Sequence, residues 1–75
     1  ESSNARLAIV VHDYQQESET LQQAIDRTTN QAEVLKSQLI NQGLAGQRLE
    51  AYGVGPLSPY AELRYPRVDL VLLPR

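Results

Sequence analysis

Residues 7–11 read Leu-Ala-Ile-Val-Val, an uninterrupted apolar run that is rich in β-branched side chains. A run of this length and composition is typical of a strand buried on both faces, as in a parallel sheet with a helix across it. His12, Asp13 and Tyr14 follow the run and mark the polar carboxyl end of the strand. The rest of the chain is therefore expected to assemble around this strand.

A helical pattern occupies the middle of the chain. Thr20 with Gln23 has the spacing of a capping box at its start. Gly43, followed by the apolar Leu44, is typical of a Schellman cap at its end. Between them, apolar residues recur at intervals of three and four and form one stripe: Leu21, Ala24, Ile25, Ala32, Leu35 and Leu39.

The stripe weakens at residues 28–30, which read Thr-Thr-Asn. Such side chains compete with the backbone for hydrogen bonds and lower helix propensity. Thr28 with Gln31 also has the spacing of a second capping box. We therefore favour two helices, over about 19–27 and about 29–42, that meet at a kink; one continuous helix is the alternative.

Two further strands are predicted. Residues 47–54 alternate polar and apolar side chains at Leu49 and Ala51, and glycine and proline then interrupt the pattern. Residues 67–73 form the last strand, with three apolar side chains on one face: Val68, Leu70 and Leu72.

The order strand, helix, strand, strand predicts an α+β fold: a two-layer β-α-β-β sandwich with the helix packed on a small mixed sheet. The helical crossover makes the first two strands parallel, and the last strand is expected to run antiparallel at an edge or beside them. Residues 1–6 are expected to be a disordered tail, and residues 7–75 a single domain.

Composition narrows the function. The 75 residues carry a formal net charge of -2, and only 21% are charged, which argues against a nucleic-acid-binding protein. No apolar run approaches the roughly 20 residues that cross a bilayer, so no membrane insertion of this segment is expected. Cysteine is absent, which excludes disulfides and thiolate metal sites.

Catalytic chemistry is not expected. His12 and Asp13 are the only adjacent acid–base pair, but neighbouring residues on a strand point to opposite faces and cannot easily serve one another. No serine lies in a nucleophile-elbow context, and one histidine with scattered carboxylates is a poor metal site. We therefore predict a non-enzymatic protein with no cofactor and no metal.

One stretch follows a recognisable pattern. Ala51, Gly53, Gly55 and Pro59 have the spacing A-x-G-x-G-x-x-x-P, which resembles a motif of OmpA-like peptidoglycan-binding domains. The strand end at His12-Asp13, the glycine-capped helix end and the last strand resemble further parts of that family in the same order. The resemblance covers about residues 7–73 and implies a truncated, divergent OmpA-like domain that lacks the family's opening strand and helix.

The resemblance also implies a ligand site. In the family, an aspartate and an arginine bind the diaminopimelate of the peptidoglycan stem peptide through charge-assisted hydrogen bonds. Gln31 stands where the arginine belongs, so the charged contact is degraded. The remnant site is expected to consist of Asp13, which would take the ammonium group, Arg67, which would take a carboxylate, and Gln31.

The resemblance implies a periplasmic module of a Gram-negative cell-envelope protein. Its partner would be peptidoglycan or, with the diaminopimelate contact degraded, other envelope proteins. The alternative is a structural or assembly domain of a larger secretion or envelope complex that binds no peptidoglycan. The sequence leaves the oligomeric state open.

Overall fold

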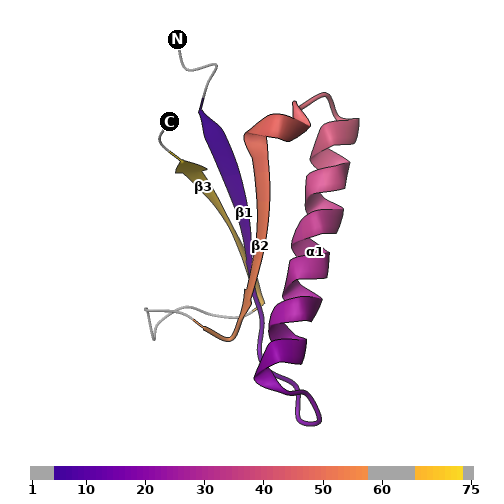
Figure 1. Cartoon of the computed structure of the whole chain (residues 1–75), viewed down its shortest axis with the longest axis vertical. Helices are drawn as coiled ribbons and strands as arrows, with labels where there is room; N and C mark the ends of the chain where they lie inside the picture. Colours follow the sequence, from indigo (N-terminus) through magenta and orange to yellow (C-terminus); the bar gives the residue numbers. More distant parts are fainter. Residues whose placement is uncertain (1–4, 58–65, 74–75) are drawn as a thin grey trace.

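A computed structural model describes residues 5–57 and 66–73 and shows a two-layer α+β arrangement (Figure 1). Its elements follow in the order β1 (Arg6–His12), α1 (Leu21–Asn41), the short 3-10 helix η2 (Gly46–Arg48), β2 (Leu49–Gly55) and β3 (Arg67–Leu73). The helix packs against one face of a small mixed sheet, which confirms the fold class predicted from the sequence.

The strand order in the sheet is β2-β1-β3, so the first apolar run forms the central strand. β1 and β2 are parallel, with Ile9 beside Ala51, and a bulge lies between Val11 and His12. β1 and β3 are antiparallel without a register shift, and Ile9 lies opposite Leu70. Both strand directions are as predicted.

The core lies between α1 and the β1–β2 half of the sheet. Ile9 and Ala32 are completely buried, and Val11 is nearly so. Around them pack partly buried apolar side chains: Leu35, Leu39 and Ala51. The apolar stripe predicted for the helix therefore faces the sheet at Ala32, Leu35 and Leu39, and Ala24 in its first half is completely buried as well.

The favoured kink in the helix is wrong, because α1 is one continuous helix from Leu21 to Asn41, which was the alternative. Thr28 does not cap a second helix. Its hydroxyl Oγ1 lies 2.9 Å from the carbonyl oxygens of both Ala24 and Ile25, and it donates within the helix. A threonine that bonds the preceding turn in this way is accommodated in a helix interior.

The two predicted ends of the helix are confirmed. Thr20 and Gln23 form the capping box, with each side chain accepting from the other residue's backbone N–H. Gly43 has a φ of 106°, and Leu44 donates its N–H to the Leu39 carbonyl at 3.1 Å. These two features define a Schellman motif.

The helix approaches β2 unusually closely, because small residues line both surfaces. A Cβ atom on Gly53 would lie 1.9 Å from the Thr29 nitrogen, so only glycine fits at this point. Gly55, at a φ of 56°, donates its N–H to Thr28 Oγ1 at 3.0 Å. The side chain of Thr28 is completely buried by this packing.

Two boundaries differ from the prediction. Residues 1–4 lie outside the described part of the chain, but Arg6 belongs to β1 rather than to a tail, and its guanidinium pairs with Glu50 on β2. The second strand begins at Leu49, not at residue 47, because η2 precedes it. Pro59 of the A-x-G-x-G-x-x-x-P pattern also lies outside the described residues.

Candidate ligand-binding groove

A groove runs between α1 and β3 on the helix side of the sheet. Its wider part has a volume of about 700 Å³ and lies where β1 ends and β3 begins. A second part of about 350 Å³ continues along β3, and both parts are lined by Leu35 and Val68. Among the described residues, α1 packs chiefly on β2 and β1, and this packing leaves the groove along the helix-facing side of β3.

The three site residues predicted from the sequence all line the wider part of this groove. Asp13 follows β1, Gln31 lies in the middle of α1, and Arg67 opens β3. Because β3 runs antiparallel to β1, its first residue lies beside the last residue of β1, His12. The fold thus brings to one surface three residues that are far apart in the sequence.

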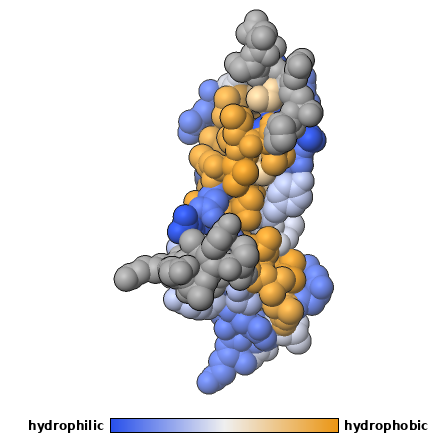
Figure 2. Space-filling view, turned by 90° about the vertical axis from the view of Figure 1, so that its left-hand side faces the viewer, coloured by the Kyte–Doolittle hydropathy of each residue, from blue (hydrophilic) through white to orange (hydrophobic). Residues whose placement is uncertain are grey.

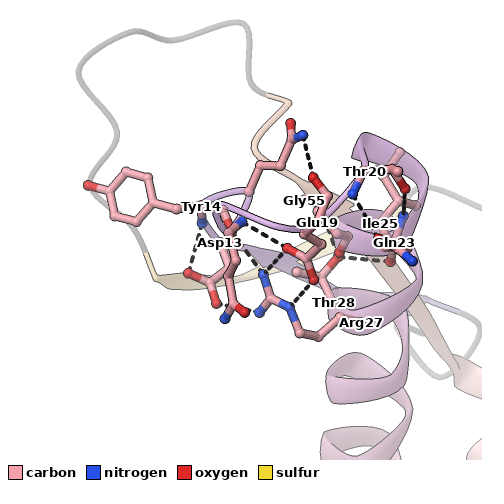
Figure 3. A network of polar contacts seen from close by, with 12 residues as sticks. Asp13, Tyr14, Glu19, Thr20, Gln23, Ile25, Arg27, Thr28 and Gly55 are labelled. Atoms are coloured by element: carbon pink, nitrogen blue, oxygen red, sulfur yellow. Dashed lines mark hydrogen bonds and ion pairs between the residues drawn. The ribbon is translucent and has the colours of Figure 1, made fainter.

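Asp13 is bound by a residue that the prediction did not include. The Arg27 guanidinium donates from Nη1 to Asp13 Oδ2 at 2.7 Å and from Nε to Glu19 Oε2 at 2.8 Å (Figure 3). Its Nη2 donates to the Tyr14 carbonyl at 2.8 Å and to Glu19 Oε1 at 3.0 Å. One guanidinium therefore fixes both ends of the β1–α1 loop.

The charges in this cluster stabilise one another. The hydrogen bond from Arg27, together with the Gln16 backbone N–H, holds the pKa of Glu19 below its ordinary value. Hydrogen bonds to Glu19 and Asp13 raise the pKa of Arg27, so it stays charged. Two carboxylates against one guanidinium leave the cluster with one net negative charge, which favours a cationic ligand group at this end of the groove.

Gln31 lies one helical turn after Arg27, so the two side chains occupy the same face of α1. Its side chain is exposed and lines the groove. An amide can donate or accept a hydrogen bond there, but it supplies no charge.

Arg67 is also paired. Its Nε lies 2.7 Å from Asp69 Oδ1, and the other oxygen of Asp69 lies 3.1 Å from His12 Nε2. The hydrogen bond from Arg67 is the main reason that the pKa of Asp69 lies below its ordinary value, and His12 adds to it. The Arg67 side chain is almost half exposed but pairs with Asp69, which lies on the face of the sheet opposite the helix, so it can meet a ligand only at the end of the groove where β3 begins.

The residues that sequence reasoning missed are Arg27, Glu19 and Asp69. A signal existed for Arg27, since it lies four residues before Gln31 and therefore on the same helix face. Nothing in the sequence marks Glu19, whose contact depends on the path of the β1–α1 loop. His12 and Asp13 point to different partners, Asp69 and Arg27, as expected for neighbours at a strand end.

Within residues 5–57 and 66–73, no three histidine or acidic side chains gather in a way that could hold a metal ion. The described helix is too polar to cross a membrane. Comparison with known proteins gives no matching family model and no matching curated protein. The OmpA-like resemblance of the sequence therefore stays a prediction.

Proposed function

We propose that this chain is a non-enzymatic, OmpA-like binding module of a Gram-negative cell-envelope protein, and that it faces the periplasm. Its ligand is the diaminopimelate-containing stem peptide of peptidoglycan, which enters the groove between α1 and β3. The observation that supports this proposal is that Asp13, Gln31 and Arg67 all line one groove. They offer an anion, an amide and a cation to a zwitterionic ligand.

The existing ion pairs do not prevent such binding. The Arg67–Asp69 pair is partly exposed, and surface ion pairs are worth only about 0–1 kcal/mol each. The Asp13–Arg27 pair is more buried, but the Asp13 side chain is still 21% exposed. A ligand ammonium can therefore share Asp13 with Arg27, and a ligand carboxylate can accept from Arg67 and from the amide of Gln31. Because these contacts replace internal ones, we expect a weak complex, with a Kd on the order of 1 mM.

A titration of the isotope-labelled chain with a diaminopimelate-containing muropeptide tests this proposal. NMR shifts are expected around Asp13, Gln31 and Arg67, and a lysine-containing muropeptide, which lacks the second carboxylate, should produce smaller ones. Gln31→Arg should tighten binding about tenfold or more, because a charged hydrogen bond is worth about 1.5–3 kcal/mol. Absence of shifts at millimolar ligand, or equal shifts with both muropeptides, would overturn it.

A second candidate function is assembly through protein contacts in a secretion or envelope complex. It is favoured by the exposure of apolar side chains on β3, where Leu70 is 60% and Leu72 is 70% exposed. The test compares complex formation by two variants. If Leu70→Glu abolishes assembly and Gln31→Ala does not, assembly through β3 is supported over wall binding. If Gln31→Ala abolishes assembly and Leu70→Glu does not, ligand binding in the groove is supported instead.

A further inference from the structure

β3 lies at the edge of the sheet that the described residues form. It pairs with β1 on one side only, and the strand order places no described strand on its other side. Its seven residues pair with β1 without a bulge, and Asp69 is its only charged residue between the first position and the last. Bulges, prolines and inward charges are the devices that normally protect such edges, so β3 is suited to pair with another strand.

The side chains of β3 are apolar where they are exposed. On the helix-facing side, Val68 is 48% exposed, and Leu70 and Leu72 are more exposed still. Val71, on the opposite face, is also exposed. Figure 2 shows apolar surface gathered on the side of the molecule where β3 lies in Figure 1. A contiguous apolar patch of this kind marks an interaction surface.

The other edge of the sheet, β2, is less suited to pairing. It contains Gly53 and Gly55, the second with a positive φ, and its register with β1 shifts at a bulge. It also carries the helix packed closely upon it. Irregular, glycine-containing strands pair poorly, so the interaction is assigned to β3.

We infer that two copies of this chain associate through antiparallel pairing of β3 with β3 around a two-fold axis at Leu70. This inference does not depend on the ligand proposed above. A two-fold axis perpendicular to the sheet makes the two strands antiparallel and keeps both helices on the same face. The result is a continuous six-stranded sheet in which each open edge covers the other.

The register follows from the side chains. With the axis at Leu70, Val68 lies opposite the partner's Leu72, and all three apolar pairs stand on the helix side. Asp69 then lies opposite the partner's Val71, so no like charges face each other. An axis at Asp69 would instead set two carboxylates directly opposite one another, which destabilises strand pairing.

The size of the interface sets the expected affinity. A seven-residue strand is about 24 Å long, so its edge and flanking side chains bury on the order of 1,000 Å² in total. This is near the lower limit for a specific interface, and we therefore expect a weak, concentration-dependent dimer.

Sedimentation velocity between about 5 and 500 μM tests the inference. The wild-type chain should shift from monomer to dimer as concentration rises. Leu70→Lys sets two ammonium groups opposite each other at the axis and should weaken the dimer at least tenfold. Leu57→Lys is the matched control, since Leu57 is about as exposed but lies outside β3. Circular dichroism verifies that both variants are folded.

The absence of cysteine allows a direct probe of the register. Leu70→Cys should form an intermolecular disulfide under mild oxidation, because residues opposite each other in antiparallel strands have Cβ atoms about 4.5–5.5 Å apart. Leu57→Cys should crosslink much more slowly. A chain that stays monomeric at 500 μM, a dimer unaffected by Leu70→Lys, or equal crosslinking of both cysteine variants would overturn the inference.

Discussion

Gly53 illustrates how a single residue sets the distance between the helix and the sheet. A Cβ atom at this position would lie 1.9 Å from the Thr29 nitrogen and 2.3 Å from the Thr28 carbonyl carbon. Both are backbone atoms, so no side-chain rotation relieves the clash. The helix could accept a larger residue only by lifting from β2 and weakening the core contacts around Ala32 and Ala51.

Gly53→Ala is therefore expected to lower the free energy of unfolding by roughly 3 kcal/mol or more, at the upper end of overpacking effects. Urea denaturation followed by circular dichroism measures this loss. Gly46→Ala is the control, because its Cβ would meet only the end of the Ile40 side chain, at 3.1 Å, and that side chain can rotate. Equal loss in both variants would show that the close helix–strand contact is not what requires glycine.

Thr28 joins the helix to β2 by a hydrogen bond. Its buried hydroxyl accepts from the Gly55 N–H at 3.0 Å. Thr28→Val keeps the shape but removes the acceptor, so a buried N–H loses its partner, which costs about 1–3 kcal/mol. Thr28→Ser keeps the hydroxyl and should be the more stable of the two variants. Thermal unfolding of both, together with amide exchange at Gly55, measures the difference; greater stability of the valine variant would contradict this role.

These residues also explain what the sequence could and could not show at this scale. The spacing of Gly53 and Gly55 was recognised as a motif, and both glycines meet the helix backbone rather than line the groove. The part of the family resemblance that rests on them therefore concerns helix–strand packing. The sequence predicts a helix cap at Thr28, because the low helix propensity of threonine is visible in the sequence and its hydrogen-bond partner on β2 is not.

Among the elements, the β1–α1 loop depends most on charge. Glu19 and Asp13 are held by Arg27 across the loop, and the pKa of Glu19 lies below its ordinary value of 4.5. A carboxylate with a lowered folded-state pKa contributes stability that is complete above its unfolded pKa. That contribution is lost as the pH falls through the folded pKa.

Glu19→Gln is therefore expected to lower Tm near pH 7, and the difference from wild type should vanish as the pH falls below about 4. Thermal unfolding of both proteins between pH 2.5 and 7 measures it. Asp69 is present in the wild type and in the variant, so its contribution to the pH dependence of Tm cancels in the comparison. A Tm difference that stayed constant down to the lowest pH would mean that Glu19 acts through packing and not through its charge.

The elements themselves were largely predictable. Apolar residues repeat every second position in a strand and every third or fourth position in a helix, because local backbone geometry sets these spacings. These repeats located the three strands and the helix, and residue types at its ends located its two caps. The Arg27 contacts were not predictable, because they join residues on either side of a loop whose path depends on the helix position. The position of Asp13, Gln31 and Arg67 on one groove was an expectation of the family resemblance that periodicity alone could not supply.

At the scale of the whole molecule, the groove results from a mismatch of widths. A helix with its side chains is about 10 Å across and covers about two strands spaced at about 4.8 Å. α1 lies over β2 and β1, so within residues 5–57 and 66–73 no helix covers the third strand. The sequence showed that Val68, Leu70 and Leu72 share a face, but it could not show that this face is left open.

Because one face of β3 is exposed, its side chains should contribute less to the free energy of unfolding than those of β1. Ile9 and Leu70 are opposite each other across β1 and β3, yet Ile9 is completely buried and Leu70 is 60% exposed. At a few micromolar, where the chain is expected to be monomeric, Ile9→Val should cost about 0.5–1.5 kcal/mol. Leu70→Thr should change stability by less than about 0.5 kcal/mol, although it removes more apolar surface.

Chemical denaturation at two protein concentrations separates the stability of the single chain from the stability added by dimer formation. The loss from Ile9→Val should be the same at 5 and 500 μM, because the core lies within one chain. The loss from Leu70→Thr should increase with concentration, because a dimer that forms through β3 adds its binding free energy to folding. A large loss from Leu70→Thr at the lower concentration would mean that this face is already covered within a single chain, and the open groove would then not describe the molecule in solution.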